Sequence, residues 1–348
     1  MAKRPSVSMK DVAALAQVSV GTISNVLNKP DLVAPETRQR VLDAIDKLGW
    51  VRNESARQLR AGRSASIGVV VMDIANPFFS DMARGVEEVA AARGCSVLLS
   101  DSAHDAGRER AALDLFQQLR VRGVILAPVA HNPDADLARR LDMPVVLADR
   151  YAAYQDVCTV SVDDFEGGRL AVAHLLEQGH RRLAVVGGTA DIPQVRERRD
   201  GADRAVLLGS ADATLLTLST DRLDIAAGRI AAQTILAMSD TERPTGVFAL
   251  NDLVAIGLLQ GLVRRGVAVP EEIGIVGYDD IEFAEAAAVP LSSVAQPRVD
   301  LGRRAAALLF DEIDEREGGA PHRHAQERFT PTLRVRASSF DDRSVPAG

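Results

Sequence analysis

The stretch MKDVAALAQVSVGTISNVLN, residues 9–28, decides the fold of the amino-terminal part of the chain. Its pattern predicts two short helices joined by a tight turn. Ser8 and Asp11 have the spacing of a capping box, and Ser19 can cap the second helix. Apolar residues recur at helical spacing and predict the buried faces: Val12, Leu15 and Ala16 in the first helix, and Ile23, Val26 and Leu27 in the second.

The second of these helices has small or polar residues on its remaining face: Val20, Gly21, Thr22, Ser24 and Asn25. A helix with such a slim amino-terminal end fits the major groove of DNA, which would make the pair a helix-turn-helix. An ordinary helical hairpin explains the same pattern. This segment alone therefore leaves both interpretations open.

The residues that follow favour the first interpretation. Pro35 begins a third predicted helix, with Val41, Ile45 and Leu48 on one face and Gly49 as its stop. The ordered motifs KDVA, VSxxTxSxVLN, ETRxRVLxAIxxLGW and NxxARxLRxGRS resemble those of the LacI/GalR family of bacterial transcription regulators, and the resemblance continues to about residue 338. It implies an all-α helix-turn-helix headpiece (1–50), a hinge helix and linker (51–65), an effector-binding and dimerisation body (66–340) and a tail (341–348).

The charge is distributed unevenly along the chain. Residues 1–63 contain 11 Lys and Arg against 6 Asp and Glu, whereas the remainder contains 30 against 42. A basic head on an acidic body indicates that only the head meets a polyanion such as DNA. The split therefore agrees with the helix-turn-helix interpretation.

Residues 50–63 are the expected hinge. About two helical turns are not stable alone in water, so we expect this segment to become helical only against DNA and a second subunit. In the family, a leucine of the paired hinge helices opens the central base step from the minor groove, and Leu59 matches it. A solvated linker is the alternative. Base contacts are expected from Val20, Gly21, Thr22 and Asn25, and phosphate contacts chiefly from Lys10, Arg38, Arg57 and Arg60.

From Ser66 onwards, short apolar strands alternate with helical segments. The predicted strands are 67–72, 96–100, 123–127, 145–148, 160–162, 183–186, 215–218, 246–249, 273–276 and 293–295, and residues 326–336 resemble the family's final strands. This order predicts two parallel α/β sheets side by side, and the body resembles periplasmic sugar-binding proteins. With crossings near 162, 292 and 321, lobe 1 comprises 66–162 and 293–320, and lobe 2 comprises 163–292 and 321–338.

Polar and aromatic residues just past the strands are the candidates for an effector cleft, because ligands bind at the carboxyl ends of parallel strands. The candidates from this rule are Asn76, Phe78, Phe79, Asp149, Asp163, Asn251, Asp279 and Gln296, and the family resemblance implies Arg198 as a further one, through its RxxG motif. Carboxylates, amides and an arginine suit a hydroxyl-rich ligand such as a sugar. For Asp164 and Asp252, helix capping is an equal alternative. Leu223 lies near the place where some family members have a stacking aromatic.

Other functions find little support in the sequence. There is no GxSxG, no GxGxxG after a strand and no phosphate loop, so we do not expect an enzyme. Cys95 and Cys158 have no metal or redox spacing and are expected to be buried thiols. His322 and His324 lie in a segment rich in Gly, Pro and charge, which favours a solvated loop over a metal site. We expect neither metal nor cofactor.

The sequence thus predicts a cytoplasmic, homodimeric transcriptional regulator, most often a repressor in this family. It would bind a palindromic double-stranded operator, and a small molecule between the two lobes would control the affinity. No apolar run is long enough to span a membrane, and no secretory signal precedes the headpiece. The alternative is a cytoplasmic sugar-binding protein whose head does not read DNA.

Overall fold

The computed structural model describes residues 7–50, 64–129, 141–151, 156–189, 191–209 and 211–340. The chain divides into two compact units, residues 1–63 and 64–348. The predicted hinge residues Arg57, Leu59 and Arg60, and the tail 341–348, lie outside the described residues.

Within residues 7–50, the described part of the first unit, there are three α-helices and a short 3₁₀ turn: α1 (Met9–Ala16), α2 (Val20–Asn28), η1 (Pro30–Leu32) and α3 (Pro35–Leu48). The predicted caps are confirmed. The Ser8 backbone N–H donates to Asp11 Oδ2 at 2.8 Å, and the Thr22 N–H donates to Ser19 Oγ at 3.0 Å. Gly49 ends α3 in the left-handed conformation, with φ of 59°.

The headpiece core forms where the three apolar faces meet. Val12, Ile23 and Val41, one from each helix, are fully buried. The prediction that Leu15 belongs to this core is wrong, because its side chain is 42% exposed while Ala13 is buried instead. Compared with the prediction, the buried face of α1 is therefore shifted around the helix, away from Leu15 and towards Ala13.

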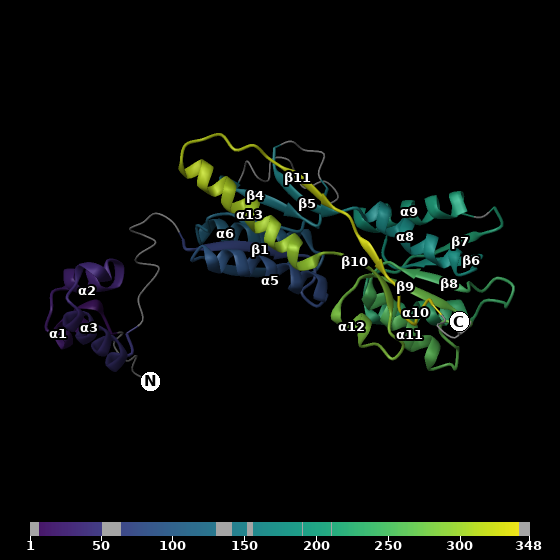
Figure 1. Cartoon of the computed structure of the whole chain (residues 1–348), viewed down its shortest axis with the longest axis horizontal. Helices are drawn as coiled ribbons and strands as arrows, with labels where there is room; N and C mark the ends of the chain where they lie inside the picture. Colours follow the sequence, from purple (N-terminus) through teal and green to yellow (C-terminus); the bar gives the residue numbers. More distant parts are fainter. Residues whose placement is uncertain are drawn as a thin grey trace, which may run out of the picture. The chain divides into compact units, whose positions relative to one another are not determined.

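The second unit is built on two six-stranded sheets, one for each lobe (Figure 1). The first has the order β11-β5-β4-β3-β1-β2 and is parallel throughout. Its strands are β1 (Ser66–Val71), β2 (Ser96–Asp101), β3 (Val124–Leu126), β4 (Val145–Ala148), β5 (Cys158–Val162) and β11 (Gln326–Phe329). The predicted doubly covered parallel sheet is confirmed for lobe 1.

The second sheet has the order β12-β10-β9-β8-β6-β7 and is parallel except for the β10–β12 pair. Its strands are β6 (Arg182–Val186), β7 (Thr214–Leu218), β8 (Gly246–Ala249), β9 (Gly274–Asp279), β10 (Ser292–Ala295) and β12 (Thr332–Arg334). Every predicted strand of the body is present in one of the two sheets.

Two of the predicted lobe boundaries are wrong. The prediction placed 293–320 in lobe 1 and 321–338 in lobe 2, but β10 pairs with β9 in the second sheet and β11 pairs with β5 in the first. The chain therefore crosses after β5, after β10 and after β11, where Figure 1 shows the yellow segment continuing from β11 into the second lobe. Short crossing segments are hard to place from hydropathy, because the strands before and after them look alike.

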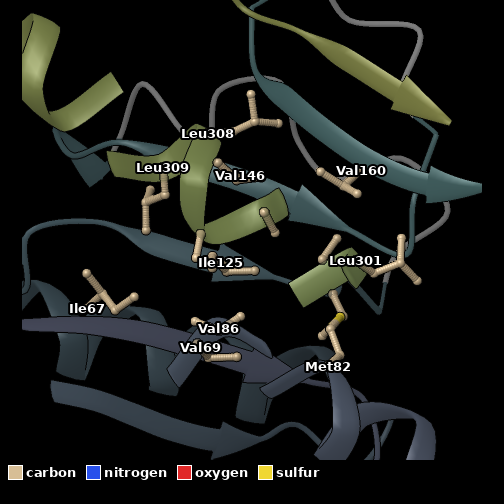
Figure 2. Close-up of a cluster of buried hydrophobic side chains, with 14 of the residues drawn as sticks. Ile67, Val69, Met82, Val86, Ile125, Val146, Val160, Leu301, Leu308 and Leu309 are labelled. Carbon is tan, nitrogen blue, oxygen red and sulfur yellow. The ribbon is translucent and has the colours of Figure 1, made fainter. Parts of the chain in front are cut away.

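Helices cover both faces of each sheet. In lobe 1, α5 (Pro77–Ala92) and α13 (Arg298–Glu317) pack against each other on one face, and α6 (Ala106–Gln118) packs on β1 and β2. Figure 2 shows Met82 and Val86 of α5 meeting the apolar side chains of α13 and of the sheet. In lobe 2, α8 (Asp164–Glu177) and α9 (Pro193–Gly209) pack as one pair, and α10 (Ile225–Leu236) and α11 (Asp252–Val263) pack as another; the short α12 (Glu282–Glu285) follows β9.

Strand residues alternate between the two faces of the lobe 2 sheet. Val247 and Ala249 of β8 join the core under α10 and α11, whereas Phe248 joins the core under α8 and α9. Both faces are thus apolar, and the polar residues gather at the strand ends. None of the helices in the described ranges has the length and apolar character to cross a membrane.

Candidate effector-binding cleft

A cavity lies between the two lobes, at the carboxyl ends of the strands. Residues after β1, β2 and β4 supply the lobe 1 wall, and residues from α9, from the segment before α10 and from the ends of β8, β9 and β10 supply the other wall. The lining residues are Met72, Asp73, Asn76, Phe78, Phe79, His104, Asp149, Ile192, Gln194, Val195, Arg198, Leu223, Asn251, Asp279 and Gln296. Eight of the nine predicted cleft residues are among them.

The exception is Asp163, and its prediction as a cleft residue is wrong. Asp163 caps α8 by accepting the Glu166 N–H at 2.9 Å, and it pairs with Arg328 at 3.1 Å. Asp164 and Asp252 are not lining residues either. Asp164 pairs with Arg198, and Asp252 accepts from Ser293 Oγ at 2.6 Å and from the Ile281 N–H at 2.8 Å. Their side chains hold the lobe 2 wall together.

Several lining residues were not predicted. Met72, Asp73 and His104 follow β1 and β2, so the strand-end rule could have found them. Ile192, Gln194 and Val195 lie at the start of α9, where the sequence offers no signal that separates lining positions from buried ones. Leu223 does line the cavity, in agreement with its position near a family aromatic.

Arg198 is the centre of the lobe 2 wall. Its Nε donates to Asp164 Oδ1 at 2.7 Å, and its Nη1 donates to the Leu250 carbonyl at 2.6 Å. The guanidinium carbon lies 3.6 Å from the centroid of the buried Tyr278 ring. Although burial alone would lower the pKa of Arg198, Asp164 and the neighbouring acidic groups raise it. The cation is thus fixed in one position before any ligand arrives.

The backbone around Arg198 depends on a close approach of α8 and α9. A Cβ atom on Gly168 would lie 1.9 Å from the Arg198 carbonyl oxygen, and one on Gly201 would lie 1.9 Å from the Phe165 carbonyl oxygen. Side chains at these two positions would push the helices apart. The glycines therefore place Arg198 within reach of Asp164.

Asp149 is the main acceptor of the lobe 1 wall. Gln194 Nε2 reaches across from lobe 2 and donates to the Asp149 carbonyl at 2.6 Å and to its Oδ2 at 2.9 Å. The other carboxylate oxygen is buried without a hydrogen-bond partner. Asp149 also has φ of 54°, a left-handed conformation that costs of order 1 kcal/mol and occurs often at functional sites.

A second acidic group, Asp279, faces the cavity from the end of β9. Gln296 Nε2 donates to Asp279 Oδ1 at 2.7 Å, and Asn76 Nδ2 lies 3.5 Å from its other oxygen. Asn251 caps α11 and donates from Nδ2 to the Leu223 carbonyl at 2.9 Å. These amides orient the acceptors and connect α5, β9 and β10 around one space.

Burial changes the protonation of both acids. It raises the pKa of Asp149 to about 7, with a further increase from the charge of Asp164, and it raises the pKa of Asp279 to about 6. Arg198 lowers both values but does not cancel the effect. Titratable groups with such shifts gather at binding sites, because a ligand can compensate for their lost hydration.

The unpaired groups of the cavity are acceptors. Asp149 Oδ1, Gln194 Oε1 and Gln296 Oε1 are buried without partners, beside the edge-to-face rings of Phe78 and Phe79, whose centroids are 5.0 Å apart. Hydroxyl groups on a ring with an apolar face would satisfy such a wall. The cavity leaves only about 50 Å³ for the centres of water molecules, which is well below the roughly 300–1,000 Å³ of typical ligand pockets.

The headpiece carries the other set of predicted contacts. Val20, Gly21, Asn25, Lys10 and Arg38 are exposed, and Thr22 is partly exposed. Val20 is 42% exposed although it is apolar, so it is free to meet a thymine methyl group. The exposed end of α2 therefore has the chemistry that base contacts require.

Two family models match the chain. Residues 8–53 match "Bacterial regulatory proteins, lacI family", and residues 172–339 match "Periplasmic binding protein-like domain". The HTH-type transcriptional repressor CytR of Escherichia coli K12 is 33% identical over 317 residues, which is 91% of this chain and 92% of CytR.

Two solved structures extend the similarity to ligand complexes. The transcriptional regulator CelR in complex with cellobiose is 30% identical, with a TM-score of 0.70, over 96% of this chain and all of that one. A LacI family regulator from Enterococcus faecium with bound ribose is 32% identical, with a TM-score of 0.70, over 79% of this chain and 98% of that one.

Proposed function

The chain belongs to the LacI family of bacterial transcriptional regulators and is a DNA-binding repressor with a ligand-binding body, and from this premise we propose that a sugar or a related polyhydroxylated ring controls its operator affinity. The observation that carries the proposal is the set of unpaired acceptors, Asp149 Oδ1, Gln194 Oε1 and Gln296 Oε1, beside the Phe78 and Phe79 rings. The sugars bound by CelR and by the Enterococcus faecium regulator support this ligand class.

Both walls of the cleft contribute contacts to the ligand. Arg198 donates to a ring or hydroxyl oxygen, while Asp149 and Asp279 accept from hydroxyl groups. The phenylalanine rings cover an apolar face of the ligand. Since the lining comes from both lobes, the ligand is held only when they close, and its binding energy shifts the equilibrium between open and closed forms.

Closure of the two lobes changes the operator affinity through the amino-terminal unit, which binds the DNA. The protein acts in the cytoplasm as a homodimer whose two headpieces bind the halves of a palindrome. Val20, Gly21, Thr22 and Asn25 contact bases, and Lys10, Arg38, Arg57 and Arg60 contact chiefly phosphates. Leu59 wedges into the central step. The coupling free energy between cleft and operator is expected to be about 1–3 kcal/mol.

Selection of genomic DNA fragments by the purified protein at near-physiological salt tests the proposal, first without ligand and then with a panel of sugars and nucleosides. We expect a short palindrome, with an affinity that one class of ring compound changes. Binding of a sugar without any selected DNA would instead support the alternative, a cytoplasmic sugar-binding protein whose head does not read DNA.

Substitution of Asn25 separates base readout from general DNA affinity. Asn25→Ala should weaken binding to the selected palindrome by about 1–3 kcal/mol and leave salt-dependent binding to random DNA unchanged. Gln39→Ala, an exposed residue of α3, is the control and should change neither affinity. An equal loss on both DNAs would show that Asn25 does not read bases.

Leu59→Ala should likewise reduce specific binding more than non-specific binding.

A further inference from the structure

A second cluster of polar side chains lies in lobe 1, away from the cleft. Cys158 is the first residue of β5, so it lies at the edge of the sheet opposite the carboxyl ends that form the cleft. Glu312 of α13 and two histidines of the loop before β11, His322 and His324, surround it. One ligand atom from each of the four residues lies within 4.8 Å of every other.

Two distances in this cluster bracket those around a tetrahedral metal ion. Cys158 Sγ lies 3.1 Å from His322 Nε2 and 3.8 Å from His324 Nδ1. With Zn–N bonds near 2.0–2.1 Å and Zn–S bonds near 2.3 Å, tetrahedral geometry places neighbouring ligand atoms about 3.4–3.6 Å apart. Small side-chain adjustments would bring the four atoms to these positions.

A buried acceptor in the cluster lacks a partner. Glu312 is only 9% exposed, and its Oε2 is buried without a hydrogen bond. A buried carboxylate oxygen without a partner is costly, and native proteins compensate for such groups with a hydrogen bond, a cation or a metal. This orphaned oxygen belongs to a residue of the same cluster, and it is an observation independent of the histidine and cysteine distances.

The residues behind the cluster orient one of its histidines. His322 Nδ1 lies 2.8 Å from Glu315 Oε2, which directs the other ring nitrogen, Nε2, towards Cys158. Carboxylate–histidine–metal arrangements of this kind are the rule at zinc sites, because the carboxylate fixes the ring and increases its basicity. The His322 side chain is 11% exposed, so the prediction of a solvated histidine loop is wrong for this residue.

We propose that Cys158, Glu312, His322 and His324 form a zinc-binding site in lobe 1. A thiolate and two imidazoles are soft and borderline ligands that favour Zn²⁺ over Mg²⁺ or Ca²⁺, which prefer oxygen. The thiolate and the carboxylate balance the two positive charges of the ion. With four protein ligands the site is structural, and it joins β5, α13 and the loop before β11.

The ion has a route to these ligands. A cavity with about 360 Å³ for the centres of water molecules borders Glu312, His322 and His324. A bound ion would hold the loop of residues 318–325 against the beginning of β5, where the Thr159 N–H already donates to the Ala325 carbonyl at 2.9 Å. The site would therefore stabilise the pairing of β11 with β5, the outermost pair of the first sheet.

Titration of the untagged, metal-free full chain with Co²⁺, which adopts zinc geometry and absorbs visible light, tests the proposal. We expect about one Co²⁺ per chain, tetrahedral d–d bands, a thiolate-to-cobalt band in the near ultraviolet, and displacement by Zn²⁺. Zn²⁺ should also raise the unfolding temperature, because it binds only the folded chain tightly.

Matched variants assign the ligands. Cys158→Ser should abolish the thiolate band and His324→Gln should reduce Co²⁺ affinity by at least tenfold, whereas Cys95→Ser, at the other buried cysteine, should change neither. Glu315→Gln should weaken binding by about 10–100-fold while the band persists. Unfolding temperatures measured in chelator show which variants are folded. If Cys158→Ser does not fold, the test relies on His324→Gln, which changes a partly exposed position. Absence of a thiolate band in the folded wild-type protein, or a band that survives Cys158→Ser, would overturn the proposal.

Discussion

The two walls of the cleft are built differently. In the lobe 2 wall, Arg198 is held by Asp164, by the Leu250 carbonyl and by the Tyr278 ring, all within the same lobe. The lobe 1 wall has its main acceptor, Asp149, held by Gln194 from the opposite lobe, and one oxygen of this acid has no partner. Arg198 thus has its partners before the lobes close, whereas Asp149 obtains its partners through closure and from the ligand.

This difference has a physical reason. A buried arginine without a partner costs several kcal/mol, so the cation must be paired at all times. A buried carboxyl group can instead take up a proton. Because burial raises the pKa of Asp149 to about 7, this group can be neutral when no ligand is bound. Arg198 therefore needs standing partners, whereas Asp149 and Asp279 can change their charge instead.

The largest effect is expected from breaking the paired wall. Arg198→Leu should lower the free energy of unfolding of the body by about 3–5 kcal/mol, because it leaves the Asp164 charge buried without its partner. Urea unfolding followed by circular dichroism measures the change. The matched control is Arg204→Leu, at an exposed position of the same helix, which should change the value by less than about 0.5 kcal/mol.

A second substitution separates loss of the pair from loss of packing. In Arg198→Leu combined with Asp164→Asn, no uncompensated charge remains, so part of the stability should return. If the double variant is as unstable as Arg198→Leu, the contact with the Tyr278 ring, and not the ion pair, holds this wall.

How far the sequence predicts the cleft follows from the same contrast. Asp149 and Asp279 were predicted because each follows a strand that is recognisable from its own residues. Asp163 meets the same rule and yet caps a helix, because the direction of a side chain depends on packing that no local pattern encodes. Gln194 was missed because it lies on a helix and matters only through its contact across the cleft.

The zinc-site residues show the same limit at longer range. Cys158 and His322 are 164 residues apart, and they meet only because β11 pairs with β5. The predicted lobe boundary at residue 321 assigns that segment to lobe 2, which separates the histidines from the cysteine. Headpiece caps, in contrast, join residues three apart, and they were predicted correctly.

An intermediate effect on stability is expected from the protonation of Asp149 in the lobe 1 wall. The folded body holds the Asp149 proton up to a pKa of about 7, whereas the unfolded chain releases it near 4. Between these values the folded state binds more protons, so the free energy of unfolding should fall as pH rises, by at most about 1.4 kcal/mol per pH unit. Asp149→Asn, which tolerates the positive φ, should remove this contribution.

Urea unfolding at several pH values between 5 and 7.5 measures this dependence in the wild type and the variant. Asp163→Asn is the control, since asparagine keeps the cap of α8 and the position lies outside the cavity. The control should retain the wild-type slope. Equal slopes in the wild type and in Asp149→Asn would mean that another group takes up the proton.

The smallest effect is expected from the contact that joins the walls. Gln194→Ala removes the amide that donates to Asp149 across the cleft, and with it about 1 kcal/mol that favours the closed form, or a factor of about five in the equilibrium. Spin labels at two exposed positions, Leu115 in α6 and Ile230 in α10, report the separation of the lobes. The variant should populate longer distances, whereas Gln260→Ala, exposed on α11, should not. Unchanged distances in Gln194→Ala would show that the lobe 1 wall is held without help from lobe 2, and the contrast between the walls would then reduce to their charge.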